Sequence, residues 1–318
     1  MWIEIRMKVE GNKMEEDQRF QVRFVVLNFT LVFSEDTALP VEKESALRGG
    51  IGEMLLRQHC IRDRNCENCS FCSACIVQNF MYAKYQNKPD FVTTGESIGF
   101  VIEAEHGKKW YEAGESFRFS LTLFGNTIVY LNPLVQAIYM LGQVGLGEKK
   151  AKFQIAAIEN RKGEPILYHG AIYYKNYQIE TLSDYIQERK ETLTNPTTIR
   201  FSKPLTIKYR GEFIQQFDIR AIINGATRRI YMLDCYEGID TEEAKFYEDL
   251  PQIKKQSVQQ KKVMRHSSRR QQSMEMKGIT GKIELDGIRE EILDYLLAGE
   301  ITHIGKNTRF GFGKYELL

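Results

Sequence analysis

The chain has 318 residues, a net charge of +2, 42% hydrophobic residues and 27% charged residues. This length exceeds one ordinary core and favours two domains. The net charge is too small for the protein as a whole to attract a nucleic acid. A nucleic-acid partner would therefore need a local basic patch. The N-terminal stretch MWIEIRMKVEGNK lacks the apolar run of a signal peptide, and no window approaches the ~20 apolar residues of a membrane span. We therefore expect a cytoplasmic protein with no membrane partner.

The first half predicts the order strand, helix, two strands, helix, glycine loop, strand. An apolar run rich in β-branched and aromatic residues indicates a strand over Phe20–Phe33. Helical spacing of apolar residues follows over Glu44–His59. The later elements are expected, in order, as strands over Ser97–Glu103 and Glu115–Leu123, a helix over Gly125–Leu141, the glycine loop Leu141–Gly147 and a strand over Ala151–Ile158.

The second half repeats this order. Its expected elements are strands over Thr198–Phe201 and Leu205–Tyr209, a mainly helical stretch over Phe213–Tyr236, a strand over Gly278–Leu285, a helix over Ile288–Leu297, the glycine loop Gly305–Gly313 and a strand over Lys314–Leu317. Both halves thus end in helix, glycine-rich loop, Gly-x-Gly and strand. This internal repeat indicates a duplicated ββαβ-type unit.

The predicted fold class is therefore α+β, with two tandem ferredoxin-like (RRM-like) domains that each carry a glycine-rich loop near the last strand. Between Tyr168 and Asn195 polar and aromatic residues alternate without a clear period. We place the domain boundary there, with an N-terminal domain over residues 1–185 and a C-terminal domain over residues 186–318. The N-terminal domain contains an inserted cysteine loop over residues 60–75.

Five of the six cysteines lie in this inserted loop, in the pattern Cys60-x5-Cys66-x2-Cys69-x2-Cys72-x2-Cys75. Such clustering favours a metal over disulfides. Four thiolates satisfy tetrahedral zinc, and we favour a structural zinc on Cys60, Cys66, Cys69 and Cys75. An iron–sulfur cluster would use the same ligands. The alternative is a set of free buried thiols.

The charge pattern changes sharply in the second half. Asp234–Pro251 holds seven acidic residues, whereas Gln252–Lys282 holds nine lysines and arginines. One interpretation is a solvated loop. The other is an arm that contacts phosphates, because clustered basic residues displace counterions from a nucleic-acid backbone. The candidate contacts in this arm are Lys261, Lys262, Arg265, Arg269 and Arg270.

A second candidate site is the last glycine loop. His303 lies between the last helix and this loop, where Lys306, Arg309 and backbone N–H groups could approach a phosphate. A histidine there suits proton transfer near neutral pH, and we name His303 first, His266 of the basic arm second, and Lys306 for charge stabilisation. The alternative for such a histidine is a structural role. The glycines expected at the RNA are Gly305, Gly311 and Gly313.

No paired carboxylates stand beside a basic site, so no catalytic metal is expected. If the chain cuts RNA, the 2′-OH of the substrate would attack the neighbouring phosphate and give a 2′,3′-cyclic phosphate and a 5′-OH. The protein would supply a base, an acid and positive charge for the pentacoordinate phosphate.

Four stretches together resemble the CRISPR-associated endoribonuclease family that processes precursor crRNA, within the RAMP superfamily. They are Leu47–Gly52 leading into the cysteines, Gly142–Gly147, Pro204–Gly211 with Ala226–Tyr236, and Arg265–Gln271 continued through Gly299 to Gly313. The resemblance implies two ferredoxin-like domains, binding of CRISPR repeat RNA, metal-independent cleavage, and other Cas proteins of an effector complex as further partners.

Two departures from the family pattern concern the site. Family members frequently place a catalytic histidine in the N-terminal half, where this chain has only His59 at the end of the first helix, and Cys72 is an extra thiol. Two other functions remain open. A non-catalytic RAMP subunit that binds guide RNA would keep the loops and the arm without a histidine at the RNA. A zinc-stabilised protein adaptor would leave the basic arm without a purpose.

Overall fold

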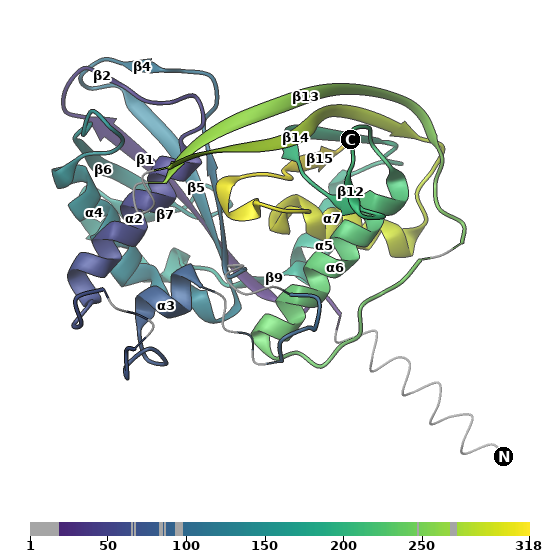
Figure 1. Cartoon of the computed structure of the whole chain (residues 1–318), viewed down its shortest axis with the longest axis horizontal. Helices are drawn as coiled ribbons and strands as arrows, with labels where there is room; N and C mark the ends of the chain where they lie inside the picture. Colours follow the sequence, from purple (N-terminus) through teal and green to yellow (C-terminus); the bar gives the residue numbers. More distant parts are fainter. Residues whose placement is uncertain are drawn as a thin grey trace.

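The computed structural model describes residues 19–64, 66, 68–82, 85, 87–92, 98–246, 248–267 and 272–318, with the backbone alone at 266, 267, 272 and 273. Two α+β halves lie next to each other, and a long two-stranded arm of the second half reaches toward the first (Figure 1). Within the described residues, no helix is both long and apolar enough to cross a lipid bilayer.

The first half has the order strand–helix–strand–strand–helix–strand. These six elements are β1 (Arg23–Phe33), α2 (Glu44–His59), β3 (Phe100–Ala104), β5 (Ser116–Phe124), α4 (Leu131–Val144) and β6 (Phe153–Glu159). The antiparallel sheet runs β3-β5-β1-β6 and continues through β7 (Pro165–Tyr168) and β8 (Ala171–Ile172). Shorter elements are β2 (Thr37–Ala38), α3 (Ile76–Met81), β4 (Trp110–Tyr111), η1 (Gly125–Tyr130) and η2 (Tyr174–Asn176).

The second half has the same order of elements and the same sheet order. Its main elements are β10 (Thr198–Leu205), α6 (Ile219–Glu237), β13 (Ile253–Ser267), β14 (Gln272–Leu285), α7 (Glu290–Thr302) and β15 (Tyr315–Leu317). Its sheet runs β13-β14-β10-β15, which matches β3-β5-β1-β6 strand for strand. Shorter elements are β11 (Lys208–Tyr209), β12 (Glu212–Phe213) and η3 (Thr308–Phe310). The predicted α+β fold of two ferredoxin-like units is therefore confirmed.

Apolar burial holds each half together and also joins the two. Strand β1 buries alternate side chains such as Leu27, Phe29 and Leu31 in the core of the first half. The second core is built on α6, α7 and the inner strands, but it also takes in Phe24 and Phe124 of the first half. The halves consequently share buried apolar surface, which stabilises one relative arrangement.

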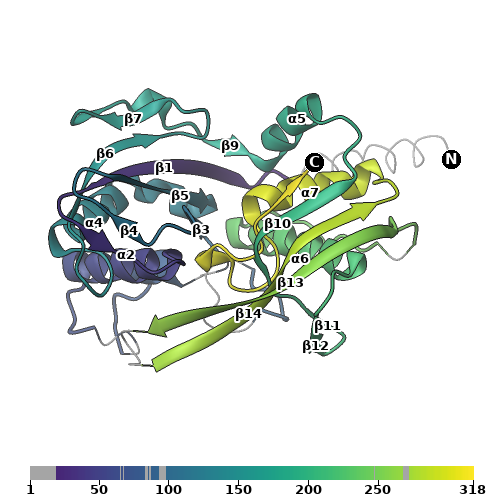
Figure 2. The ribbon, with the colours of Figure 1, turned by 90° about the horizontal axis from the view of Figure 1, so that it is seen from above.

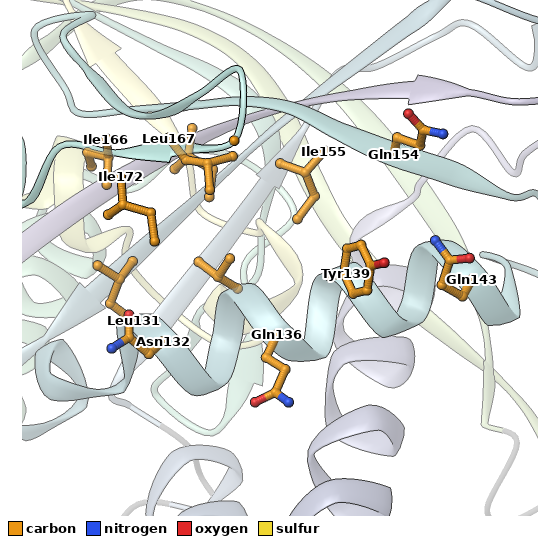
Figure 3. Close-up of a pocket in the computed structure, with 13 residues that line it drawn as sticks. Leu131, Asn132, Gln136, Tyr139, Gln143, Gln154, Ile155, Ile166, Leu167 and Ile172 are labelled. Carbon is orange, nitrogen blue, oxygen red and sulfur yellow. The ribbon is translucent and has the colours of Figure 1, made fainter.

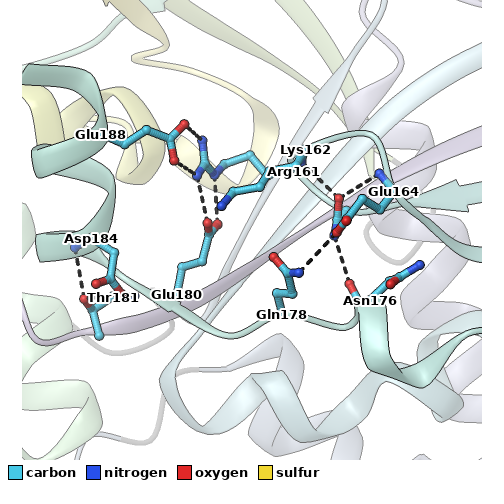
Figure 4. Close-up of polar contacts among 10 residues, drawn as sticks. Arg161, Lys162, Glu164, Asn176, Gln178, Glu180, Thr181, Asp184 and Glu188 are labelled. Atoms are coloured by element: carbon cyan, nitrogen blue, oxygen red, sulfur yellow. Dashed lines mark hydrogen bonds and ion pairs between the residues drawn. The ribbon is translucent and has the colours of Figure 1, made fainter. Parts of the chain in front are cut away.

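The connection between the halves is ordered by β9 (Glu180–Thr181) and α5 (Leu182–Thr192). The Thr181 hydroxyl accepts from the Asp184 N–H at 3.1 Å, and the Asp184 carboxylate accepts from the Thr181 N–H at 2.8 Å, which is a capping box. Arg161, beyond β6, donates to both Glu180 and Glu188 (Figure 4). The predicted boundary at 185/186 falls inside α5.

The basic segment, for which a solvated loop was one interpretation, forms β13 and the start of β14. The two strands pair residue by residue, from Val258 opposite Gly281 to Ser267 opposite Gln272. A strand of 15 residues spans about 50 Å. The outer part of this arm extends beyond the rest of its sheet and lies by α2, as both views show (Figures 1 and 2).

Candidate nucleic-acid interface

Three elements distant in sequence meet where the two halves face each other. The arm β13–β14 approaches α2, and η3 of the last glycine loop packs against both α2 and β3. The site therefore exists only when the two halves are correctly placed.

Three arginines converge here on the ring of Phe310. The guanidinium carbons of Arg48, Arg265 and Arg309 lie 5.2, 4.5 and 5.4 Å from the ring centroid. They come from α2, β13 and η3, respectively. We call these three residues the arginine cluster. Each guanidinium is within the range of a cation–π contact, so one aromatic ring gathers three positive charges.

The electrostatics of the arginine cluster favour an anion. Burial, followed by the charges of Arg309 and Arg265, lowers the pKa of Arg48 to about 9. The buried Nε of Arg48 has no hydrogen-bond partner among the described residues. A phosphate oxygen would satisfy this donor and offset the mutual repulsion of the three cations, and arginine suits phosphate because its planar fork can bond two oxygens.

An apolar contact holds the arm on the glycine loop. Val263 of β13 and Met276 of β14 are buried against Phe310 and Phe312. Because Val263 and Arg265 are two positions apart on one strand, their side chains share a face. The same packing that buries Val263 thus brings Arg265 to the arginine cluster.

His303 does not lie at this surface. It is 0% exposed, its Nε2 is 3.1 Å from Glu103 Oε1, and its Nδ1 is 3.0 Å from the Phe312 carbonyl oxygen. Burial lowers its pKa, and Glu103 offsets this only in part. With no solvent contact, His303 does not lie at a surface where a phosphate binds in this structure. This geometry favours a structural role between the halves, and proton transfer by His303 stays a prediction.

The glycine loop is likewise packed rather than open. The N–H groups of Lys306, Gly311 and Gly313 donate to the carbonyls of Thr206, Thr308 and Pro204 at 2.8, 2.9 and 2.9 Å. A Cβ on Gly313 would lie 1.9 Å from the Ile304 carbonyl oxygen. Gly311 and Gly313 are buried and serve a tight turn, and a Cβ on Gly305 would lie 2.6 Å from the Thr206 carbonyl oxygen. RNA contact through these three glycines stays a prediction, which this packing does not favour.

Ion pairs fasten the halves around the arginine cluster. Glu103 accepts from Lys314 at 3.2 Å as well as contacting His303, and Lys203 donates to Glu44 at 2.7 Å. Burial opposes ionisation of Glu103, but Lys314 and then His303 outweigh it and hold its pKa well below the ordinary carboxyl value. Since Glu44 lies four residues before Arg48 on α2, Lys203 also fixes the start of the helix that carries the arginine.

Comparison with known families now adds to this geometry. Residues 199–315 match the family model of the CRISPR-associated endoribonuclease Cas6, and residues 21–182 match a model described as an N-terminal domain, AF_1859_N. The second half of the chain thus carries a Cas6-type domain. The glycine loop and the arm that hold two of the three arginines lie within the Cas6 match. None of the curated proteins matches the chain.

Solved structures related to Cas6 share the fold. A Cas6-RT-Cas1–Cas2 complex and a partial complex of the same kind each align with 93% of the chain at 14% identity and a TM-score of 0.53. The chain spans only 29% and 46% of those two longer chains. A Cas6 product complex aligns over 93% of this chain and 100% of its own at 14% identity and a TM-score of 0.49.

The other residues predicted to bind RNA surround the arginine cluster to different degrees. Lys261, Lys262 and Lys306 are exposed, and Arg309 and Arg265 belong to the cluster itself. Arg269 and Arg270 lie outside the described residues, as does the side chain of His266. Among the sequence patterns, Arg48 belonged only to the family stretch Leu47–Gly52. The one signal for Arg48 itself was its position in a predicted helix, directly before two adjacent glycines.

The five clustered cysteines line one pocket of about 390 Å³ together with His59. No disulfide links them, and among the described residues no three His, Cys, Asp or Glu side chains are already arranged as a metal site. The donor chemistry nevertheless suits zinc, because five thiols converge on one space. The predicted zinc on Cys60, Cys66, Cys69 and Cys75 accordingly stays a prediction. His59 lies eleven residues after Arg48, about 16 Å along α2.

Proposed function

We propose that the chain is an endoribonuclease that binds CRISPR repeat RNA and cleaves precursor crRNA at the arginine cluster. One observation carries this proposal: Arg48, Arg265 and Arg309 from three separate elements converge on one ring, and the buried Nε of Arg48 has no acceptor within the part of the chain that the structure describes. The Cas6 match of the second half supports RNA as the anion and strand cleavage as the reaction.

The proposed chemistry uses the substrate's own 2′-OH. Its oxygen bonds to the adjacent phosphorus as the P–O5′ bond breaks, so the products are a 2′,3′-cyclic phosphate and a 5′-OH. One group removes the 2′-OH proton and another donates a proton to the 5′ oxygen. The arginines stabilise the added negative charge of the pentacoordinate phosphate.

For proton transfer we propose His266 in place of His303. The backbone of His266 follows Arg265 directly on β13 and pairs with Ser273 of β14, so this residue lies one position along the strand from the arginine cluster. One lost proton-transfer group typically lowers a rate by about 10²–10⁴-fold. Lys306 remains a proposed source of positive charge at the rim.

The decisive experiment incubates the purified chain with repeat RNA in EDTA. We expect one cut, a 5′-OH end that polynucleotide kinase labels without prior phosphatase treatment, and a cyclic phosphate in the mass of the other product. A single 2′-deoxy substitution before the cut should abolish cleavage. Cleavage of that deoxy substrate would contradict the proposed attack. Binding without cleavage would instead identify a guide-RNA-binding subunit, and neither activity would favour a protein adaptor.

Cas proteins are proposed as partners on family grounds alone. The two longer matched structures are a Cas6-RT-Cas1–Cas2 complex and a partial complex of the same kind. Co-purification of this chain with Cas proteins from the same operon, before and after RNase treatment, would distinguish direct contact from RNA-mediated association.

A further inference from the structure

A groove on the first half is not part of the arginine cluster. It lies between α4 and the strands β6, β7 and β8, with a volume of about 660 Å³ (Figure 3). Its walls are aliphatic, from Ile155, Ile166, Leu167 and Ile172. Strands β7 and β8 extend the sheet beyond β6. They lie past the strands that α2 and α4 cover, and this leaves a groove beside α4. All residues that line it are uncharged.

Three polar residues of the groove lie at one end, whereas Asn132 lies at the other end and Gln136 between them (Figure 3). The ring of Tyr139 lies between α4 and β6, and the amides of Gln143 and Gln154 lie beyond it at the same end (Figure 3). Tyr139 is 57% exposed although it is a large aromatic residue. An amide offers donors and an acceptor, which match the edge of a nucleobase, and an exposed ring offers a stacking surface.

Positive charge lies just beyond this end. The turn from α4 to β6 is closed by mutual hydrogen bonds between Leu146 and Ala151, at 2.8 and 2.9 Å. Around this turn Lys149, Lys150 and Lys152 are exposed. Because Gln143 precedes the turn and Gln154 follows it, the lysines lie next to the two amides. A neutral groove with aromatic and amide groups, flanked by lysines, complements a base attached to a phosphate backbone.

The groove is also connected to the arginine cluster through helix packing. A Cβ on Gly50 of α2 would lie 2.7 Å from the side chain of Leu141, so the end of α4 is packed against the start of α2. Arg48 lies two residues before Gly50, and Gln143 lies two residues after Leu141. Helices α2 and α4, which carry Arg48 and Gln143, are therefore packed directly against each other.

We propose that the groove binds unpaired nucleobases of the RNA away from the cut, with Tyr139 stacking on a base, Gln143 and Gln154 hydrogen-bonding its edge, and the turn lysines contacting phosphate. This inference rests on the proposed function, since it concerns the same RNA. An uncharged apolar groove alone would be enough to bind a protein partner. The neighbouring lysines favour RNA instead, because they complement its phosphates.

The test uses a short single-stranded RNA that carries 5-iodouridine and 2′-O-methyl groups and cannot be cleaved. Ultraviolet crosslinking followed by mass spectrometry should place the adduct on Tyr139. In anisotropy measurements Tyr139→Ala should raise the Kd of this RNA about 5- to 150-fold, the effect of one lost base stack, whereas Tyr139→Phe should retain affinity. Trp110→Ala is the matched control, because Trp110 is 53% exposed on β4 and does not line the groove.

Two results would overturn the inference: adducts confined to other residues, or a Kd for Tyr139→Ala within twofold of the unaltered chain. If Tyr139→Ala instead abolishes binding of a Cas protein but not of RNA, the groove is a protein-docking site and the inference also fails. The cleavage assay is separate. Crosslinking at Tyr139 without cleavage of any repeat RNA would contradict the proposed function alone, and cleavage without groove binding would contradict this inference alone.

Discussion

Glu103 of β3 and His303 at the end of α7 face each other across the boundary between the halves, with Oε1 and Nε2 3.1 Å apart. Lys314 reaches the same carboxylate oxygen at 3.2 Å. His303 also has a positive φ of 55°, which non-glycine residues rarely adopt. Such a conformation persists only where the surroundings fix it, and here two hydrogen bonds and complete burial do so.

The first prediction concerns this pair. His303→Ala should lower the free energy of unfolding by about 2–4 kcal/mol, because it leaves a cavity and removes the ring N–H that pairs with the Phe312 carbonyl oxygen or the Glu103 carboxylate. Urea denaturation measures this loss. Cleavage by the folded fraction should keep the pH–rate profile of the unaltered chain, since His303 does not contact RNA. A profile that loses one ionisation would show that His303 transfers a proton after all.

The second prediction is a loss of stability in acid. The folded pKa of His303 is below its ordinary value of 6.5, so the unfolded chain takes up a proton first as the pH falls below about 6.5. The folded pKa of Glu103 is also lowered from 4.5, so its contribution is present above 4.5 and is lost at lower pH. His303 therefore lowers the free energy of unfolding below about pH 6.5, and Glu103 lowers it further below pH 4.5. Glu103→Gln should remove the loss below pH 4.5, but not the one that begins near pH 6.5, in denaturation curves taken from pH 7 to pH 3.

The third prediction separates stability from activity at Arg48. Arg48→Met should stabilise the RNA-free protein by roughly 1–3 kcal/mol, because it replaces a buried cation that two arginines repel. Single-turnover cleavage should fall about 10²–10³-fold, since a donor to the charged phosphate is lost. Arg57→Ala on the same helix is the control, because Arg57 is ion-paired with Glu53 at 2.9 Å and should leave the rate unchanged. Equal effects of the two substitutions would argue against the arginine cluster.

The fourth prediction compares two helical glycines. A Cβ on Gly49 of α2 would meet nothing within 4 Å, whereas one on Gly142 of α4 would lie 2.3 Å from the Phe153 carbonyl oxygen. Gly49→Ala should stabilise the free protein by roughly 0.5–1 kcal/mol through helix propensity, and Gly142→Ala should destabilise it. Thermal unfolding distinguishes the two. Reduced RNA affinity in the more stable Gly49→Ala variant would place the RNA backbone against α2.

The fifth prediction concerns the cysteines. Elemental analysis of chain purified without chelators should find about one zinc or an iron–sulfur equivalent per molecule, as a structural site contributes folding energy. Cys66→Ser should lower the folded yield more than the cleavage rate of the folded fraction. Metal-free protein with an unchanged melting temperature would exclude the site. Cys72→Ser serves as the comparison, since Cys72 was left out of the predicted ligand set.

Sequence patterns predicted the elements that have a clear period. Helix α2 matches its predicted range, Glu44–His59, because its apolar residues recur at helical spacing. Helix α5 was missed, although Thr181 and Asp184 form a capping box whose spacing is readable in the sequence. Strand β13 was left open between a loop and an arm because both of its faces are polar, and only pairing with β14 makes it a strand.

The site was harder to predict for a different reason. The basic arm and the last glycine loop were found, but their meeting with Arg48 depends on tertiary contacts between residues more than 200 positions apart. The burial of His303 was missed for the same reason. A histidine beside a glycine loop suggests an exposed loop mouth, and nothing in the local sequence shows that Glu103 and Phe312 enclose it.

The long arm also bears on stoichiometry. In the first half the strands that correspond to β13 and β14 are β3 and β5, with 5 and 9 residues against 15 and 14. Only the second copy of the duplicated unit therefore has a hairpin long enough to reach its neighbour. A fold with internal pseudo-symmetry thus gives one asymmetric site, and we expect each chain to bind one RNA rather than two.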